Sequence, residues 1–211
     1  MTTGNFFVIS APSGTGKTSL VRAMIDQDDD IGVAVSHTTR QQRSDEIEGV
    51  NYHFITEGSF QNMVESHKFL EWATVFGHLY GTSIAAANRV LARGQHLILE
   101  IDWQGASQIR RKVEDVQTIF LFPPSHKALH DRLVRRAQDD KETVKKRLSN
   151  ALEELSHYEE YDYLVVNDDF NVALKELRQI VNGSGHLLHR NAQLPKLRNL
   201  LIDLGLGLKE D

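Results

Sequence analysis

Residues 6–20 read FFVISAPSGTGKTSL, and this stretch decides the fold. Its apolar start, Phe6 to Ser10, predicts a strand that is buried on both faces of a sheet. Apolar residues then recur at helical spacing, which predicts a helix from Lys17 to about Ile25. The residues between strand and helix form a glycine-rich turn, so the segment has the order of elements found in a phosphate-binding loop.

The turn fits the pattern G-x-x-x-x-G-K-[ST], except that Ala11 stands at its first position. An alanine is tolerable there if its φ angle stays negative. Glycines let backbone N–H groups face a phosphate, and the start of the helix adds partial positive charge. Lys17 would reach the outer phosphates of a nucleotide, and the Thr18 hydroxyl would bind Mg²⁺. The predicted nucleotide-binding loop consists of Ala11, Pro12, Ser13, Gly14, Thr15, Gly16, Lys17 and Thr18.

Apolar runs further along the chain predict four more strands. They lie at Val33–Ser36, His96–Ile101, Thr118–Phe122 and Tyr163–Val166. Helices are expected between them, including long helices with basic faces over residues 125–157. Strands that alternate with helices form parallel units. We therefore predict an α/β fold of the P-loop NTPase type, with an open parallel five-stranded sheet flanked by helices.

Residues 38–82 interrupt this alternation with polar loops, short alternating pieces and a helix that is predicted to begin at Ser59 in SFQNMVESHKFLEWA. This stretch is interpreted as an insertion. At the other end of the chain, residues 191–211 contain leucines at helical spacing, which predicts an amphipathic helix. One interpretation is that this tail packs back on its own domain, and the other is that it forms a contact in a homo-oligomer.

The composition excludes several classes of protein. The chain has 211 residues and no cysteine, which removes disulfides, thiolate metal sites, iron–sulfur clusters and cysteine nucleophiles. No apolar run approaches the roughly 20 residues of a membrane helix, and the first residues lack a signal-peptide pattern. The net charge of −5 argues against a general nucleic-acid binder. We therefore expect a cytoplasmic protein that binds neither membranes nor nucleic acids.

Positive charge gathers in one segment of the chain. Residues 125–150 contain eight Lys or Arg and four Asp or Glu, a net charge of +4 that leaves −9 for the rest. Such a run is usually a solvated helical face. Outside it, Arg40 and Arg43 lie three residues apart in SHTTRQQR. This spacing suits a second phosphate clamp, because arginine binds phosphate through paired N–H groups.

Two acidic residues lie at the end of the strand predicted over His96–Ile101. Glu100 and Asp102 are two residues apart, so their side chains should leave the same face of the strand. A P-loop fold places an acid there, near the magnesium ion and its water. Either carboxylate is a candidate to bind Mg²⁺ through water, and Glu100 is the residue assigned.

With these motifs in place, the sequence closely resembles the guanylate kinases over about residues 5–182. The shared motifs occur in the same order: SAPSGTGKTSL, SHTTR, LEWATVFGHLYGTS, LEIDWQGA, KKRLSNA and YDYLVVNDD. The resemblance implies a transfer of a phosphoryl group from ATP to GMP, and to dGMP, in purine metabolism. It also implies that the GMP phosphate is bound by Arg40, Arg43, Tyr52 and Tyr80, and that the base is read by Ser36, Glu71, Thr82 and Asp102.

The base-reading set agrees with the chemistry of guanine. Guanine offers N1–H and an amine as donors beside the O6 acceptor, so two carboxylates and a hydroxyl donor complement it. Adenine would leave a buried carboxylate unpaired, at roughly 1–3 kcal/mol per group. Strong discrimination between the two bases is therefore expected.

The resemblance also gives the basic segment a function. It implies that residues 125–148 form a lid over ATP, that residues 36–83 are a GMP-binding lobe, and that the core comprises residues 1–35, 84–124 and 149–190. Arg132, Arg136 and Arg147 match phosphate-contacting arginines of the lid, and Asn167 matches a position near adenine. The chain departs from the family at four positions: Gln42 replaces a proline, and Asp45, Arg135 and Ala137 replace glycines.

The expected reaction is an in-line transfer of the γ-phosphoryl group to the phosphate of GMP. No strong base is needed, because the acceptor is already anionic. The residues expected to be catalytic are Lys17, Arg40, Arg43, Arg132, Arg136 and Arg147. Two alternatives remain: a guanylate-kinase-like scaffold domain that binds a phosphorylated peptide, and a kinase for another nucleoside monophosphate.

Overall fold

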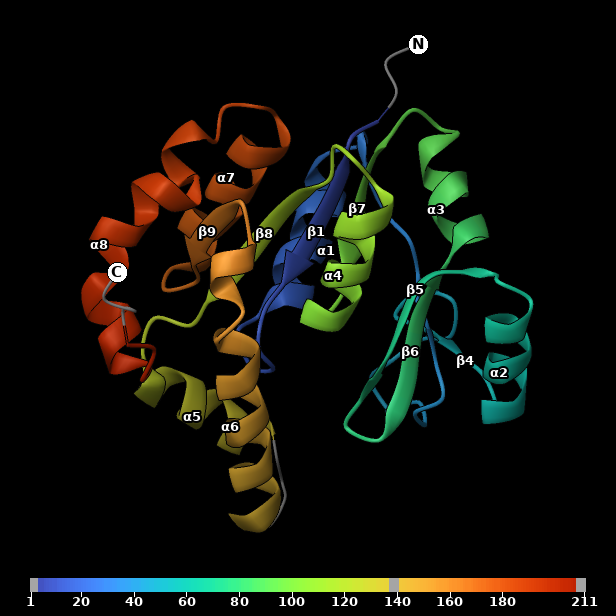
Figure 1. Ribbon diagram of the computed structural model, residues 1–211, viewed down its shortest axis with the longest axis horizontal. Helices are drawn as coiled ribbons and strands as arrows, with labels where there is room; N and C mark the ends of the chain where they lie inside the picture. The colour runs from blue at the N-terminus through green and yellow to red at the C-terminus, as the bar shows by residue number, and fades with distance from the viewer. Residues whose placement is uncertain (1–3, 137–140, 208–211) are drawn as a thin grey trace. The chain divides into compact units, whose positions relative to one another are not determined.

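A computed structural model describes residues 4–136 and 141–207 of the chain. Its main sheet has five strands in the order β2-β7-β1-β8-β9 (Figure 1). These strands are β1 (Phe6–Ser10), β2 (Ile31–Val33), β7 (His96–Glu100), β8 (Gln117–Phe122) and β9 (Tyr163–Val166). The pairs β2–β7 and β8–β9 are parallel, and Phe7, Val8 and Ile9 of the central strand β1 are buried. The predicted α/β fold with a parallel five-stranded sheet is confirmed.

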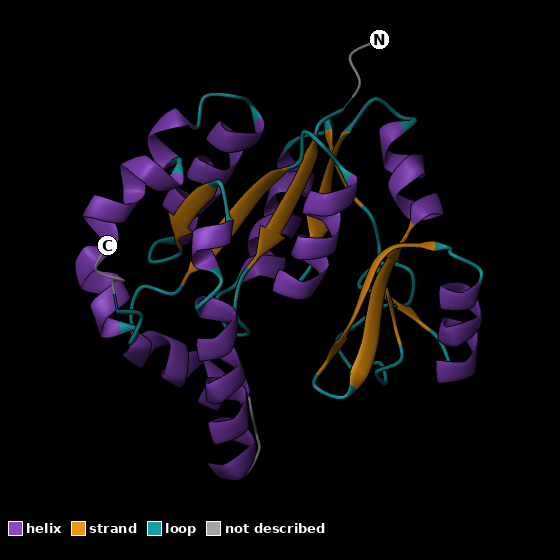
Figure 2. Cartoon of the chain, viewed as in Figure 1, coloured by secondary structure: helices purple, strands orange, loops and turns teal. Residues whose placement is uncertain are grey.

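The first of two compact units comprises the residues up to 7 and residues 28–116, and it carries a second sheet. The four strands of this sheet have the order β4-β3-β6-β5. They are β3 (His37–Thr38), β4 (His53–Phe54), β5 (Phe69–Val75) and β6 (His78–Ser83). Strands β5 and β6 form an antiparallel hairpin. Helix α2 (Glu57–Glu65) lies beside it, because the Phe60 ring stacks on Phe69 with centroids 4.4 Å apart (Figure 2).

The strand predicted at Val33–Ser36 is wrong in its position, since β2 occupies Ile31–Val33. Its register is set by pairing with β7, where Ile31 lies opposite His96. The side chain of Gln95 reinforces this register, because its Nε2 donates to the carbonyl of Asp29 at 2.7 Å. Tertiary pairing therefore places this short strand earlier than its apolar residues suggest.

The helix predicted from Ser59 is also too long. It begins at Glu57, where the Thr56 hydroxyl caps it, and it ends at Glu65. His67 then adopts a φ of 52°, which is incompatible with a continuing helix. In FLEWATV, alternate residues are buried along β5, which is the period of a strand.

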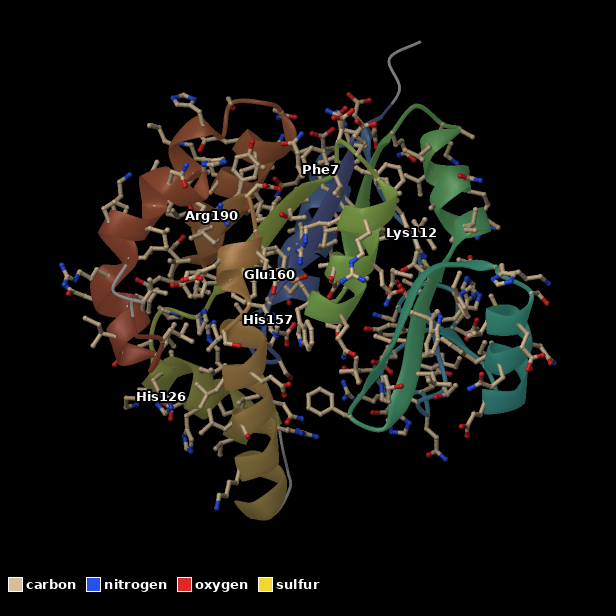
Figure 3. The ribbon with its side chains drawn as sticks, viewed as in Figure 1. Phe7, Lys112, His126, His157, Glu160 and Arg190 are labelled. Carbon is tan, nitrogen blue, oxygen red and sulfur yellow. The ribbon has the colours of Figure 1, made fainter. Side chains whose placement is uncertain are left out.

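Helices α3 (Ile84–Leu91) and α4 (Trp103–Lys112) complete the first unit. Helix α4 lies outside the helices predicted from the sequence, because few of its residues are apolar. Lys112 at its end donates to the carbonyl of Leu70 in β5, which ties α4 to the hairpin (Figure 3). Asp102 caps the start of α4 instead of extending β7. Asp102 therefore lies outside the strand that holds Glu100, although its backbone is still extended and Ile101 between the two carboxylates is buried.

The second unit comprises residues 8–27 and those from 117 onward. Its helices are α1 (Lys17–Gln27), α5 (His126–Arg136), α6 (Lys141–Leu155), α7 (Phe170–Val181) and α8 (Arg190–Asp203), with 3₁₀ turns η1 (Tyr158–Glu160) and η2 (His186–Leu188). Aromatic contacts join β8 to the segment after α6, because Phe120 lies 5.0 Å from Tyr161 and Phe122 lies 5.5 Å from Tyr158, measured between ring centroids. The helix predicted at Lys17 is confirmed, and α5 and α6 lie in the segment 125–157 where the sequence predicts helices, of which residues 137–140 are outside the described part of the chain.

The tail forms helix α8 as predicted. Its residues Leu197, Leu201 and Leu204 are buried against its own chain. Asp203 accepts a hydrogen bond from the backbone N–H of His126 at 2.7 Å, so the end of the tail contacts the start of α5 (Figure 3). The interpretation that the tail packs back on its own domain is therefore supported. None of the described helices is long and apolar enough to cross a membrane.

Candidate active site

The predicted nucleotide-binding loop follows β1 in the second unit. Gly14 and Gly16 have φ angles of +88° and +98°, a region that residues with side chains rarely adopt. Thr15 donates its backbone N–H to the carbonyl of Pro12 at 3.2 Å, which closes the turn. The two glycines are therefore required by the path of the loop.

The start of the loop and the start of α1 also have the expected form. Ala11 is buried and does not adopt a positive φ, so alanine is tolerated at this position, as predicted. Lys17 and Thr18 lie in the first turn of α1. The N–H groups of a first turn have no partner within the helix and attract anions. The segment has the geometry of a phosphate-binding loop.

Arg132 and Asn167 hold this loop in place. Asn167 follows β9 and donates from Nδ2 to the carbonyl of Thr15 at 2.6 Å. Arg132 on α5 donates to the carbonyls of Thr15 and Asn167, both at 3.2 Å. A Cβ on Gly16 would lie 2.6 Å from Asn167 Nδ2, so this contact also requires glycine. The structure thus brings two of the predicted ATP-site residues onto the loop.

The other predicted lid residues are located only in part. Arg147 lies on α6. Arg136 is the last residue of α5, and its side chain and the whole of Ala137 lie outside the described part of the chain. Arg135 lies within α5 and its Nε is 3.4 Å from the carbonyl of Asp131. Arg135 continues the helix at a position where a glycine would destabilise α5 by about 1 kcal/mol.

Three of the four residues predicted to bind a phosphate are linked in the first unit through the contacts of Arg40 and Glu46. The guanidinium of Arg40 donates to both carboxylate oxygens of Glu46, at 2.7 and 3.0 Å. Its Nε donates to the hydroxyl oxygen of Tyr80 at 3.2 Å. The backbone N–H of Arg43 donates to Glu46 at 2.9 Å, and the Arg43 side chain is 51 % exposed. Glu46 therefore joins Arg40 and Arg43.

Aromatic rings line the other side of Arg40. Its Cζ lies 5.6 Å from the centre of the Tyr52 ring and 5.8 Å from that of Phe54, which is within the range of cation–π attraction. Burial, and then the negative charge of Glu100, raises the pKa of the Tyr52 hydroxyl. Tyr52 therefore stays protonated at neutral pH and keeps a hydrogen to donate.

Three of the predicted base-reading residues form one connected group. The hydroxyls of Ser36 and Thr82 are hydrogen-bonded at 2.9 Å, and the backbone N–H of Thr82 donates to Glu71 at 2.8 Å. Glu71 is only 3 % exposed. Burial raises the pKa of its carboxyl to about 7, although hydrogen bonds from Thr82 oppose the shift. A buried carboxyl with such a shift is typical of a functional site.

Asp102 approaches this group from the start of α4. Its carboxylate accepts hydrogen bonds from the N–H of Gly105 and the side chain of Gln104, both at 3.0 Å. A Cβ on Gly105 would lie 2.6 Å from Glu71 Oε2, so only glycine allows α4 to pack this closely. Both predicted carboxylates therefore meet at Gly105.

Two residues that contact the predicted site residues, Glu46 and Gln104, are not predicted from the sequence. Glu46 lies in a polar loop, and Gln104 lies in a helix that has little apolar pattern. The loop around Glu46 also contains Gln42 and Asp45, two of the four residues that depart from the family pattern. Gln42 donates from Nε2 to the Glu46 carbonyl at 2.6 Å, and Asp45 does not adopt a positive φ.

A parallel α/β sheet in which a glycine-rich loop of this geometry joins the first strand to a helix defines the class of P-loop nucleotide-binding proteins. Comparison with known proteins narrows this class. The family model described as guanylate kinase matches residues 3–184. The chain belongs to the guanylate kinase family.

Similar proteins cover almost the whole chain. A guanylate kinase of Alkalilimnicola ehrlichii is 49 % identical over 95 % of this chain and 98 % of its own length. One of Pseudomonas fluorescens is 48 % identical over 96 % of this chain and 97 % of its own length. The crystal structure of guanylate kinase from Anaplasma phagocytophilum covers 99 % of this chain and 98 % of that one, with 28 % identity and a TM-score of 0.71.

Proposed function

We propose that this protein transfers the γ-phosphoryl group of ATP to GMP and dGMP, giving ADP and the nucleoside diphosphate. The observation that carries the proposal is the hydrogen-bonded group of Glu71, Thr82 and Ser36, in which Glu71 and Thr82 are buried. Guanine supplies N1–H and amine donors to carboxylates and its O6 acceptor to a hydroxyl. A base without these donors would leave the buried carboxylate unpaired, at roughly 1–3 kcal/mol. The group therefore favours guanine over adenine.

We assign the phosphate of GMP to Arg40, Arg43, Tyr52 and Tyr80. The exposure of Arg43 and the protonated hydroxyl of Tyr52 support this assignment, because both groups have hydrogens to offer an anion. Asp102 completes the base site, and its bonds to Gly105 and Gln104 fix its carboxylate. The lobe of residues 36–83 would then hold most of the GMP.

We assign ATP to the loop from Ala11 to Thr18, together with Asn167. Lys17 would neutralise the outer phosphates, and Arg132, Arg136 and Arg147 would stabilise charge on the group in transfer. Residues 125–148 would act as a lid that excludes water from the reaction. The bonds of Arg132 and Asn167 to the loop carbonyl of Thr15 support their place in this site.

The residues proposed for Mg²⁺ have suitable donor atoms. Thr18 has a hydroxyl and Glu100 a carboxylate, and Mg²⁺ prefers oxygen ligands and retains bound water. When bound, the ion would neutralise charge on the phosphates of ATP.

Catalysis in this proposal consists of positioning and charge neutralisation. The acceptor phosphate oxygen is already anionic, so no side chain has to remove a proton before it attacks the γ-phosphorus. We further propose that the protein acts in purine nucleotide metabolism in the cytoplasm, where both nucleotides are available.

A coupled assay of ADP release tests the proposal. GMP and dGMP should support turnover, and AMP and UMP should not. A preference for AMP or UMP would contradict the base-reading argument. Lys17→Met should abolish kcat while GMP still binds, and near-normal turnover in this variant would contradict the assignment of the loop. A scaffold domain has no need of Lys17, and it would release no ADP from ATP when GMP is added.

A further inference from the structure

We propose that Glu46 is the positioning residue of the GMP phosphate clamp. In this arrangement Glu46 holds the terminal edge of the Arg40 guanidinium, formed by Nη1 and Nη2. The side edge, formed by Nε and Nη2 and lying beside Tyr80, is then available to the phosphate. The inference rests on the proposed function and adds to it a residue that the sequence motifs leave without a role.

The hydrogen bonds of Arg40 support this division. Arginine has five N–H groups in one plane. Both hydrogens on Nη1 are used, by the carbonyl of Gln41 at 2.6 Å and by Glu46 at 3.0 Å. One hydrogen on Nη2 goes to Glu46 at 2.7 Å, and the one on Nε goes to Tyr80 at 3.2 Å. Within the described residues, no hydrogen bond uses the second hydrogen on Nη2.

That remaining hydrogen lies on the side edge, next to Nε. The bond from Nε to Tyr80 is at the upper limit of length for N–H···O. The hydroxyl oxygen of Tyr80 accepts this bond, so its own hydrogen remains to be donated. A phosphate oxygen at the side edge would therefore find donors on both Arg40 and Tyr80. Because Glu46 occupies the other edge, the phosphate need not displace it.

The surroundings of Glu46 suit a residue that holds the arginine permanently. The side chains of Glu46 and Arg40 are 11 % and 13 % exposed, and Glu46 also accepts from the N–H of Arg43. Burial alone would raise the pKa of Glu46, but the hydrogen bonds from Arg40 and Arg43 outweigh it and leave the pKa below its usual value. The carboxylate is therefore ionised at neutral pH. A two-point bond to an ionised carboxylate fixes the plane of a guanidinium.

Glu46→Gln tests the inference. The amide of the new side chain would place an N–H₂ group against an N–H of Arg40, so the terminal edge would lose an acceptor and the guanidinium could turn. We expect the KM for GMP to rise roughly ten- to a hundred-fold, the usual effect of losing a charge-assisted hydrogen bond. The KM for ATP should change by no more than about twofold, because Glu46 acts through Arg40 and ATP is assigned to the loop from Ala11 to Thr18.

Glu48→Gln is the matched control. Glu48 lies in the same loop, accepts from the N–H of Phe54 at 2.8 Å and pairs with His53 at 2.9 Å. In the described part of the chain it contacts no arginine. This variant should keep the wild-type KM for GMP, which separates the positioning of Arg40 from a general loosening of the loop.

Inhibition by guanosine provides a second readout. Guanosine has the base but no phosphate, so Glu46→Gln should leave its inhibition constant unchanged while the KM for GMP rises. Equal weakening of both would mean a collapsed lobe and would overturn the inference. An unchanged or lower KM for GMP would also overturn it, the lower value meaning that Glu46 competes with the phosphate. If the wild-type protein itself does not phosphorylate GMP, the proposed function fails as well.

Discussion

Replacing Glu71 with glutamine should change how the stability of the free protein depends on pH. Burial raises the pKa of this carboxyl from 4.5 to about 7 in the folded protein. In the unfolded chain the pKa returns to its ordinary value. Between these two values the folded state binds more protons than the unfolded state, so the free energy of unfolding falls as the pH rises. The loss is complete at about pH 8, one unit above the pKa of the folded state, because both states are then ionised.

The size of this effect follows from the shift itself. One pKa unit corresponds to about 1.4 kcal/mol, so a rise from 4.5 to about 7 amounts to about 3 kcal/mol in total. Most of it, about 2–3 kcal/mol, falls between pH 5 and pH 8. The glutamine side chain has nearly the same shape and does not titrate. Any fixed cost of its buried amide is the same at every pH and cancels from the comparison.

Urea denaturation of both proteins at several values from pH 5 to pH 8 measures the effect. The free energy of unfolding of Glu71→Gln, minus that of the wild type, should increase by about 2–3 kcal/mol over this range. A constant difference would refute the reasoning, because it would mean that Glu71 has an ordinary pKa. The same variant should bind GMP more weakly at pH 8, since one acceptor for the guanine donors is lost.

Three further outcomes are expected. Inhibition by guanosine, which has no phosphate to titrate, should weaken as the pH falls below about 7, because base binding needs ionised Glu71; a flat profile contradicts this. Gly105→Ala should raise the KM for GMP at least about tenfold, because its Cβ would lie 2.6 Å from Glu71, and leave the KM for ATP unchanged. Asp203→Ala should lower the free energy of unfolding by about 1 kcal/mol, measured by thermal denaturation, because the N–H of His126 loses its acceptor.

The main sheet and the nucleotide-binding loop could be predicted because their signals are local. Each buried strand is a short apolar run, and the loop is marked by glycines that the observed φ angles require. The second sheet has no such signal. Strands β3 and β4 have only two residues each, too few for any period, and they exist because they pair with each other and β3 pairs with β6. The end of α2 depends on the positive φ of His67. The sequence does not indicate this turn, because the residue is not a glycine.

The site residues also divide into those that could be assigned from the sequence and those that could not. Arg40, Tyr80, Glu71 and Thr82 could be assigned because a family resemblance carries their roles, and the structure brings them into two bonded groups. Glu46 could not be assigned from composition or spacing. A glutamate in a polar loop is usually a solvated residue, and only the contact with Arg40 distinguishes it.

Glu46 and Glu71 show how the surroundings of a carboxylate indicate its role. Both are largely buried, yet hydrogen bonds lower the pKa of Glu46 while burial raises that of Glu71. Glu46 has its charge matched by Arg40, so its acceptor capacity is used inside the protein and it is suited to orient another side chain. In the described residues Thr82 supplies the hydrogen bonds of Glu71, and the positive charge of Lys112 is the smallest of the causes that act on the pKa of Glu71. Its buried charge is therefore undercompensated until a ligand with N–H donors arrives, and guanine is such a ligand.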